Sequence, residues 1–129
     1  MNQQFKPSGY NSVSPYLIVN GAEKMVNLLK QIFGATELRR YDLPNGTIMH
    51  IEIQLDDSVI MISDSSEKYP PNQHLIHVYV PNSEETFNKA IEMGCESIDP
   101  PKQKGDDTDL RGTFKDFSGN LWSVSTQVE

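Results

Sequence analysis

Hydrophobic and polar positions follow the same succession of patterns twice along the chain. The run "VSPYLIVN" is apolar and rich in β-branched residues, and "GAEKMVNLLKQIFG" then places apolar residues on one stripe at helical spacing. The segments "ATELRRYD", "TIMHIEIQL" and "VIMIS" follow, and each is typical of a strand. The Asn-Gly pair in "LPNG" favours a hairpin between the first two. Residues 13–63 are therefore predicted to form strand, helix, strand, strand, strand.

The ends of the first predicted helix carry their own signals. Asn20 is expected to be the N-cap residue, because Glu23 follows it three residues later in a capping-box pattern. Gly34 is expected to end the helix, because glycine readily takes the left-handed conformation there.

The same succession starts again after "DSSEKYPPNQ", a polar linker over residues 64–73. "LIHVYV" predicts a strand, and "NSEETFNKAIEMG" predicts a helix with Asn82 as its N-cap. "CESIDPP" predicts a short strand, and "LRGTFKDF" and "NLWSVSTQ" predict a hairpin joined by "SG". Residues 74–129 thus repeat the order of elements predicted for residues 13–63. Residues 1–12 form a tail before the first module.

The repeat predicts an α+β fold of two βαβββ modules. Each helix would cover one face of a mixed sheet, and the opposite faces would curve around a shared half-barrel or cleft. In "TIMHIEIQL", the polar residues His50, Glu52 and Gln54 would then face the cleft. The alternating apolar residues of the same strand are expected to pack under the helix: Met49, Ile51, Ile53 and Leu55.

Composition and charge narrow the function classes. The chain has 129 residues and a formal net charge of −7, which argues against non-specific binding to nucleic acid or to anionic membranes. No segment approaches the roughly 20 apolar residues that a membrane span needs, and the N-terminus lacks the shape of a signal peptide. A cytoplasmic protein is expected. The single cysteine, Cys95, excludes an intrachain disulfide and is expected to be a buried thiol.

Four segments carry a family resemblance: "SPYLIVNGAEKMVNLLKQIFGATEL", "GTIMHIEIQLDDSVIMISD", "HVYVPNSEETFNKAIEMGCE" and "RGTFKDFSGNLWSVSTQVE". With them the chain resembles the vicinal oxygen chelate superfamily of glyoxalases, bleomycin-resistance proteins and extradiol dioxygenases, most closely its PhnB-like branch. The resemblance implies paired βαβββ modules and a homodimer. Because members of this fold differ widely in activity, it leaves the activity open.

The resemblance also locates where metal-using members place their ligands. Carried over one by one, these positions fall at Ser14, Met61, Leu75 and Ser123. None of these residues is a good ligand for a divalent ion, so no metal site of the standard kind and no cofactor are expected. The hairpin "DFSGNLW" also departs from the branch, because Asn120 stands where its pattern has histidine.

Candidate catalytic residues lie on the polar face of "TIMHIEIQL". Glu52 could act as a general base whose pKa is raised in a closed cleft, with His50 polarising the substrate. The "MHIE" motif resembles the "MHAE" of the branch. Alternatively, the two form an ordinary hydrogen-bonded pair in a wet groove. His50, Glu52 and His77 could also form a non-standard metal site.

Further residues are candidates for binding a ligand. Tyr16, His77 and Tyr79 would give the cleft a wall suited to a planar molecule, and Ser123 belongs to the same face. Arg111 could hold an anionic group, or could pair with a nearby aspartate.

Three functions follow from these observations. The first is binding of a small organic molecule without the standard metal site. The second is a glyoxalase-, lyase- or dioxygenase-type enzyme with Glu52 as base, metal-free or with the His50, Glu52 and His77 set. The third is a protein–protein interaction module.

Overall fold

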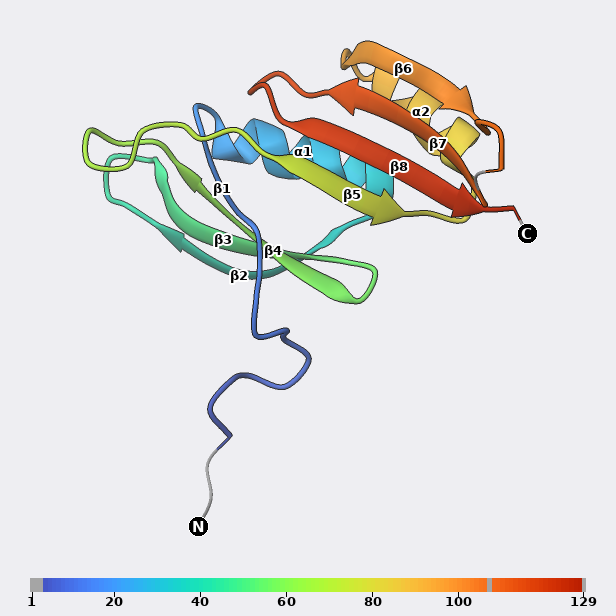
Figure 1. The fold of residues 1–129 in the computed structure, drawn as a ribbon. Helices are drawn as coiled ribbons and strands as arrows, with labels where there is room; N and C mark the ends of the chain where they lie inside the picture. Colours follow the sequence, from blue (N-terminus) through green and yellow to red (C-terminus); the bar gives the residue numbers. More distant parts are fainter. Residues whose placement is uncertain (1–3, 107, 129) are drawn as a thin grey trace. The chain divides into compact units, whose positions relative to one another are not determined.

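The computed structural model describes residues 4–106 and 108–128. The chain forms two compact units that divide between Asn72 and Gln73. Each of them contains one helix and one sheet, which Figure 1 draws as ribbons. Each unit is described by itself below.

The first unit contains β1 (Tyr16–Val19), α1 (Ala22–Phe33), β2 (Thr36–Asp42), β3 (Ile48–Leu55) and β4 (Ser58–Asp64). Its sheet has the order β1-β4-β3-β2. β1 and β4 are parallel, and the other neighbours are antiparallel. The helix makes this arrangement possible, because only a long crossover can carry the chain back to a parallel position.

The second unit repeats this topology with β5 (Leu75–Tyr79), α2 (Ser83–Glu92), β6 (Glu96–Lys102), β7 (Asp109–Lys115) and β8 (Leu121–Gln127). Its sheet has the order β5-β8-β7-β6, with β5 and β8 parallel. The predicted α+β fold of two βαβββ modules is confirmed as two open, four-stranded mixed sheets.

The core of the first unit lies between α1 and its sheet. The predicted helical stripe is buried, with the exposed fraction of Met25, Val26 and Leu29 at 0%. On the sheet, alternate residues of the strands face this stripe and are equally buried: Leu17, Val19, Ile51, Ile53 and Ile62.

The start of α1 differs from the predicted capping box. The N-cap residue is Gly21 in a left-handed conformation, and it makes no side-chain capping bond. Asp64, at the end of β4, takes over this role, because its Oδ1 accepts hydrogen bonds from the backbone N–H groups of Gly21 at 3.2 Å and Ala22 at 2.8 Å. A carboxylate is well suited to this place, where the helix leaves N–H groups unpaired. Gly34 ends the helix as predicted.

Met49 does not pack under the helix, which corrects one prediction for β3. Its side chain is 51% exposed, whereas Ile48 is 2% exposed. The pairing of β2 with β3 is irregular here, since Tyr41 pairs with His50 but Asp42 pairs with Ile48. This bulge inserts one residue and reverses the alternation before His50. Ile51, Ile53 and Leu55 are buried as predicted.

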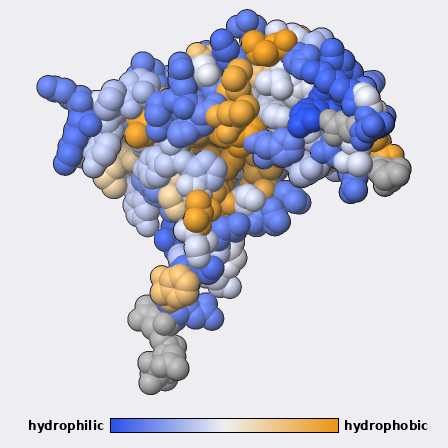
Figure 2. All heavy atoms as spheres, viewed as in Figure 1, coloured by the Kyte–Doolittle hydropathy of each residue, from blue (hydrophilic) through white to orange (hydrophobic). Residues whose placement is uncertain are grey.

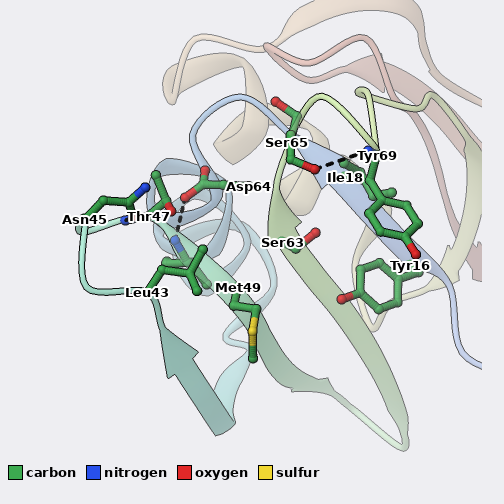
Figure 3. Close-up of a pocket in the computed structure, with 12 residues that line it drawn as sticks. Tyr16, Ile18, Leu43, Asn45, Thr47, Met49, Ser63, Asp64, Ser65 and Tyr69 are labelled. Atoms are coloured by element: carbon green, nitrogen blue, oxygen red, sulfur yellow. Dashed lines mark hydrogen bonds between the residues drawn. The ribbon is translucent and has the colours of Figure 1, made fainter.

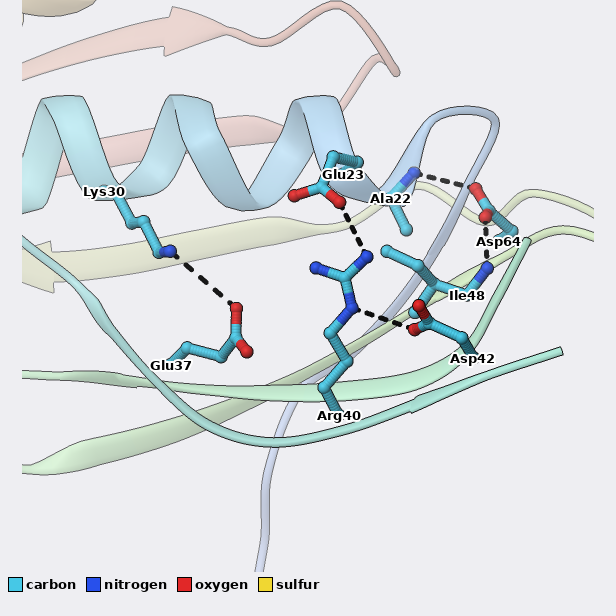
Figure 4. Close-up of polar contacts among 8 residues, drawn as sticks. All are labelled: Ala22, Glu23, Lys30, Glu37, Arg40, Asp42, Ile48 and Asp64. Carbon is cyan, nitrogen blue, oxygen red and sulfur yellow. Dashed lines mark hydrogen bonds and ion pairs between the residues drawn. The ribbon is translucent and has the colours of Figure 1, made fainter. Parts of the chain in front are cut away.

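Ion pairs connect the edge strand β2 to α1 (Figure 4). Arg40 lies 2.7 Å from Glu23 of the helix and 2.8 Å from Asp42 of its own strand. Lys30 of the helix lies 3.8 Å from Glu37 of the strand. These half-exposed ion pairs make the helix-facing side of β2 polar. Charged side chains on an edge strand discourage its pairing with strands of other molecules.

The segment before β5 is fixed to the first sheet by Asn72. Its side-chain Oδ1 accepts from the backbone N–H of Ile18 at 2.9 Å, and its Nδ2 donates to the carbonyl of Tyr16 at 3.1 Å. Its backbone N–H donates to the carbonyl of Ile18 at 3.1 Å. These bonds satisfy the open edge of β1.

The second unit is organised around a buried carboxylate. Asp116 is 4% exposed and accepts hydrogen bonds from the backbone of Ser118 and Asn120 and from the indole N–H of Trp122. Asn120 is fully buried, and its Oδ1 accepts from the backbone N–H of His74 at 2.8 Å. Asn120 therefore ties the hairpin between β7 and β8 to the residue before β5. Asn82 caps α2 as predicted, accepting from the N–H of Glu85.

Cys95 is buried as predicted, with an exposed fraction of 8%. Burial, together with the negative charge of Asp116, raises the pKa of its thiol to about 11. The thiol therefore stays protonated and unreactive at neutral pH.

Polar and charged residues cover much of the face drawn in Figure 2, and apolar side chains reach the surface between them. Within the described residues, no helix is long and apolar enough to cross a membrane.

Candidate functional site

Three of the predicted site residues meet on the face of the first sheet that lies opposite α1. Tyr16 on β1 and Glu52 on β3 are both paired with Met61 of β4, which lies between them. His50 lies two residues before Glu52 on β3. Strand alternation sends all three side chains to the same face, as the sequence predicted for His50 and Glu52.

A chain of hydrogen bonds joins them. The Tyr16 hydroxyl lies 2.8 Å from Nδ1 of His50, and Nε2 of His50 lies 2.8 Å from Oε2 of Glu52. Glu52 is 5% exposed. Because an ionised carboxylate only accepts hydrogen bonds, the imidazole must donate from Nε2. In the neutral imidazole Nδ1 is then an acceptor, and the tyrosine hydroxyl donates to it.

Two residues of this cluster escaped sequence reasoning. The Tyr10 hydroxyl donates a hydrogen bond to Oε1 of Glu52, and Nε of Arg39 lies 3.8 Å from the same oxygen. Arg39 is the partner of Glu52 across β2 and β3, so an exact strand register would have identified it. Tyr10 lies in the predicted tail, and no local pattern marks it as a site residue.

The pKa of Glu52 is lowered, contrary to the rise expected for a base in a closed cleft. Burial by itself would raise the pKa, but the hydrogen bonds from Tyr10 and His50 and the nearby positive charge of Arg39 outweigh it. The same contact raises the pKa of Tyr10, because its hydroxyl donates to the carboxylate. Glu52 is therefore ionised at neutral pH, and hydrogen-bond donors occupy both of its oxygens.

A cavity of about 600 Å³ opens beside this cluster, within the first unit. Figure 3 shows the rings of Tyr16 and Tyr69 on one side of it and Leu43 and Met49 on the other. Tyr69 comes from the segment after β4, which the sequence presented as a linker. The bulge on β3 places Met49 here instead of under the helix. Other lining residues come from the ends of β1 and β4 and from the turn before β3: Ile18, Asn45, Thr47, Ser63 and Asp64.

The charge that lines the cavity has one sign, negative. Among the described residues that line it, Asp64 is the only charged one. Its Oδ2 also accepts a hydrogen bond from the backbone N–H of Ile48 at 2.7 Å. Burial opposes ionisation, but the backbone hydrogen bonds from Ile48, Ala22 and Gly21 prevail and lower the pKa of Asp64. Asp64 is therefore ionised at neutral pH and gives the cavity a negative charge.

The remaining predicted residues lie in the second unit. Nδ1 of His77 lies 3.1 Å from the hydroxyl of Ser123. The ring of His77 meets the ring of Tyr79 edge-on, at 4.9 Å between centroids. Tyr79 donates to Asp109 at 2.8 Å, and Arg111 lies on β7 opposite Ser125. These residues form a polar face of the second sheet, and their predicted part in ligand binding stays a prediction.

The residues at the metal positions that the resemblance implies do not fit a divalent ion. Met61 offers only a thioether, and Leu75 offers no donor atom. The hydroxyl of Ser123 is engaged with His77. Over the described parts of the chain, no group of three or more His, Cys, Asp or Glu side chains is arranged to hold a metal ion. The set of His50, Glu52 and His77 draws on both units and stays a prediction.

Solved structures share this fold over nearly the whole chain. Protein PA1353 from Pseudomonas aeruginosa is 24% identical, with 91% of this chain and 98% of that chain covered and a TM-score of 0.74. TnmS3, an antibiotic binding protein from Streptomyces sp. CB03234, is 16% identical, with 92% and 99% covered and a TM-score of 0.68. FosX, a fosfomycin resistance protein from Listeria monocytogenes in complex with manganese(II) and sulfate, is 19% identical, with 91% and 90% covered and a TM-score of 0.69.

Sequence comparison agrees with the fold. The uncharacterised protein Rv0887c of Mycobacterium tuberculosis is 22% identical over 130 aligned positions, which cover 91% of this chain and 75% of that protein. The model of the Glyoxalase/Bleomycin resistance protein/Dioxygenase superfamily matches residues 9–124. With the repeated βαβββ topology and this match, the chain belongs to the glyoxalase/bleomycin resistance protein/dioxygenase superfamily.

Proposed function

We propose that this protein binds a small, planar organic molecule, uncharged or cationic, in the cavity of its first unit, without the standard metal site of the family. The observation that carries the proposal is the cavity itself. Its volume of about 600 Å³ falls within the range of roughly 300–1,000 Å³ that is usual for small-molecule sites.

The lining suits a planar ligand with an apolar body. The rings of Tyr16 and Tyr69 offer aromatic surface, and Leu43 and Met49 offer apolar surface opposite them (Figure 3). Methionine adapts its shape to different ligands, since its side chain is unbranched and flexible. Hydroxyl and amide groups at the rim would orient polar substituents, as is usual in such sites.

The charge of the cavity favours neutral and cationic ligands over anions. Among the described lining residues, only Asp64 is charged, and the whole chain carries a formal charge of −7. An anion would lose hydration on entry without gaining a cationic partner.

The known relatives support binding without fixing the ligand. TnmS3 is an antibiotic binding protein, and FosX is a fosfomycin resistance protein that was solved with manganese(II) and sulfate. The non-ligand residues Met61 and Leu75 favour metal-free binding for this chain. The "MHIE" motif supports a place in the PhnB-like branch. Homodimerisation and a cytoplasmic location remain predictions.

A matched pair of probes tests the proposal. We expect 2-naphthamide to bind at least about tenfold more tightly than 2-naphthoate, because the two share a ring system and differ in charge. Perturbed amide resonances of residues around Ser63, followed by nuclear magnetic resonance during titration, would locate the site. Equal affinity for the two probes, or resonance changes confined to the second unit, would contradict the proposal.

Filling the cavity should abolish this binding. Met49→Trp is expected to reduce affinity for 2-naphthamide at least about tenfold, because the larger side chain occupies the volume that the ligand needs. The position is 51% exposed, so the fold should tolerate the change. Ile98→Trp, at a position of the second unit that is 45% exposed, is the matched control and should bind the probe as the wild type does.

A further inference from the structure

We infer that Tyr16 is a proton-transfer residue of this cavity, and that His50 and Glu52 act behind it as positioning residues. The inference rests on the proposed function, since a ligand must enter the cavity before Tyr16 can act on it. It assigns the cavity a second capacity, the removal and return of a proton on a bound carbon acid.

Tyr16 connects the cavity to the hydrogen-bonded side chains behind it. It lines the cavity and also begins the hydrogen-bonded chain to Glu52. Of the hydrogen-bonded residues Tyr16, His50 and Glu52, only Tyr16 is among the described residues that line the cavity. Figure 3 shows the Tyr16 hydroxyl directed toward the side of the cavity where Met49 lies. A ligand between the two tyrosine rings and Met49 would therefore meet this hydroxyl and not the carboxylate.

The hydrogen bonds that join Tyr16, His50 and Glu52 all run in one direction. Glu52 fixes the proton of the neutral imidazole on Nε2, which leaves Nδ1 to accept the proton of Tyr16. When Tyr16 takes a proton from a ligand, its own proton can pass to Nδ1. The imidazolium that forms lies 2.8 Å from an ionised carboxylate, which stabilises its positive charge. A carboxylate that orients a histidine behind a hydroxyl group is a known catalytic arrangement.

Neighbouring side chains engage Glu52 on both of its oxygens. Tyr10 occupies its Oε1, His50 occupies its Oε2, and Arg39 lies close by. With both oxygens engaged and the pKa lowered, Glu52 is a poor base toward a ligand. It is well placed to hold the histidine instead, a different role from that of the base predicted from sequence.

The step balances without a further reactant. One C–H bond of the ligand breaks as the Tyr16 O–H bond forms, and the original Tyr16 O–H bond breaks as the N–H bond at Nδ1 forms. The ligand keeps the electron pair. Return of the proton to another atom of the ligand would complete an isomerisation, and no oxidant or reductant is needed.

A probe reaction tests the inference directly. In 5-nitrobenzisoxazole, an uncharged planar molecule, removal of the C–H proton breaks the N–O bond and gives a coloured cyanophenolate. We expect the wild type to accelerate this reaction with saturation. Tyr16→Phe should lower kcat about a hundredfold, the size of a general acid–base contribution, and leave affinity for the probe within about twofold, because only a hydroxyl is lost.

The supporting residues have their own readouts. Glu52→Gln should lower kcat at unchanged KM, and nitrogen resonances of the His50 ring should show the proton on Nε2 in the wild type and a mixture of tautomers in the variant. Tyr41→Phe is the control, because its ring lies beside that of His50 while its hydroxyl is outside the chain of hydrogen bonds. It should keep the wild-type rate.

Equal rates for the wild type and Tyr16→Phe would overturn the inference, and so would a His50 proton on Nδ1 in the neutral ring. Binding of 2-naphthamide would show whether the proposed function survives such a result. If the naphthamide still binds at the cavity, only the proton transfer is wrong. If it does not bind, the proposed function fails as well.

Discussion

Replacing Asp116 by alanine is expected to lower the free energy of unfolding by about 3–4 kcal/mol, the largest effect we predict for a single substitution. Asp116 is 4% exposed. Its carboxylate accepts from the backbone N–H groups of Ser118 at 2.9 Å and Asn120 at 3.0 Å and from the indole N–H of Trp122 at 2.8 Å. Alanine would leave these donors buried and without an acceptor, and water would have little access to replace it.

Trp122 makes this prediction easy to measure, because it is the single tryptophan of the chain and donates directly to Asp116. Its fluorescence during urea unfolding reports on the second unit, and the shift of the midpoint gives the loss of stability. Asp99→Ala is the matched control, since that side chain is 41% exposed and forms surface ion pairs with Lys102 and Lys104. It should change stability by less than about 1 kcal/mol. Similar losses in the two variants would show that the buried hydrogen bonds do not stabilise the fold.

Replacing Asp64 by alanine is expected to cost about 2–3 kcal/mol in the stability of the first unit. Its two carboxylate oxygens accept from the backbone of Gly21, Ala22 and Ile48, and Figure 4 shows the bonds from Ala22 and Ile48. They thereby cap α1 and fix the start of β3 at once. Because Trp122 lies in the second unit, amide hydrogen exchange along α1 is the suitable measurement. Asp57→Ala, at an exposed turn before β4, should leave that exchange unchanged.

The pH dependence of stability provides a second measurement on Asp64. Its pKa in the folded protein lies below the ordinary value, so its contribution is fully present above the unfolded pKa of about 4. That contribution is lost as pH falls through the folded pKa. Asp64→Asn should therefore lose less stability than the wild type between about pH 5 and pH 2. The lowered pKa of Glu52 leaves some acid sensitivity in both proteins. Parallel curves for the wild type and Asp64→Asn would contradict the assignment.

The fold could be predicted from the sequence because its signals are local. The apolar stripe from Met25 to Ile32 has the period of a helix, and Ile51, Ile53 and Leu55 have the period of a strand. Gly34 and Asn82 act within a few residues of the ends that they define. The repeated order of elements then selects the topology, since a strand, a helix and three strands have few ways to bury their apolar faces.

The candidate site could be predicted only in part. His50 and Glu52 were identifiable because they alternate with buried residues on one strand. Tyr69 and Tyr10 were not, because nothing in the neighbouring residues shows which sheet their segments return to. Of the two alternatives for His50 and Glu52, the hydrogen-bonded pair is observed, whereas the raised pKa of Glu52 is not. Burial was foreseeable from the pattern, whereas the hydrogen bond from Tyr10 comes from 42 residues away.

The sequence by itself determined the two βαβββ modules, the buried stripe of α1 and the buried side of Ile51, Ile53 and Leu55 on β3, because these depend on periodicity and residue type. Only the tertiary structure decided that Asp64 caps α1 and that a bulge directs the Met49 side chain toward the cavity. It also decided that Tyr16 lines that cavity while its hydroxyl is hydrogen-bonded to His50, which in turn contacts Glu52. Each of these depends on strand register and on contacts between distant segments. A shift of one residue in register sends a side chain to the opposite face, and periodicity alone does not fix it.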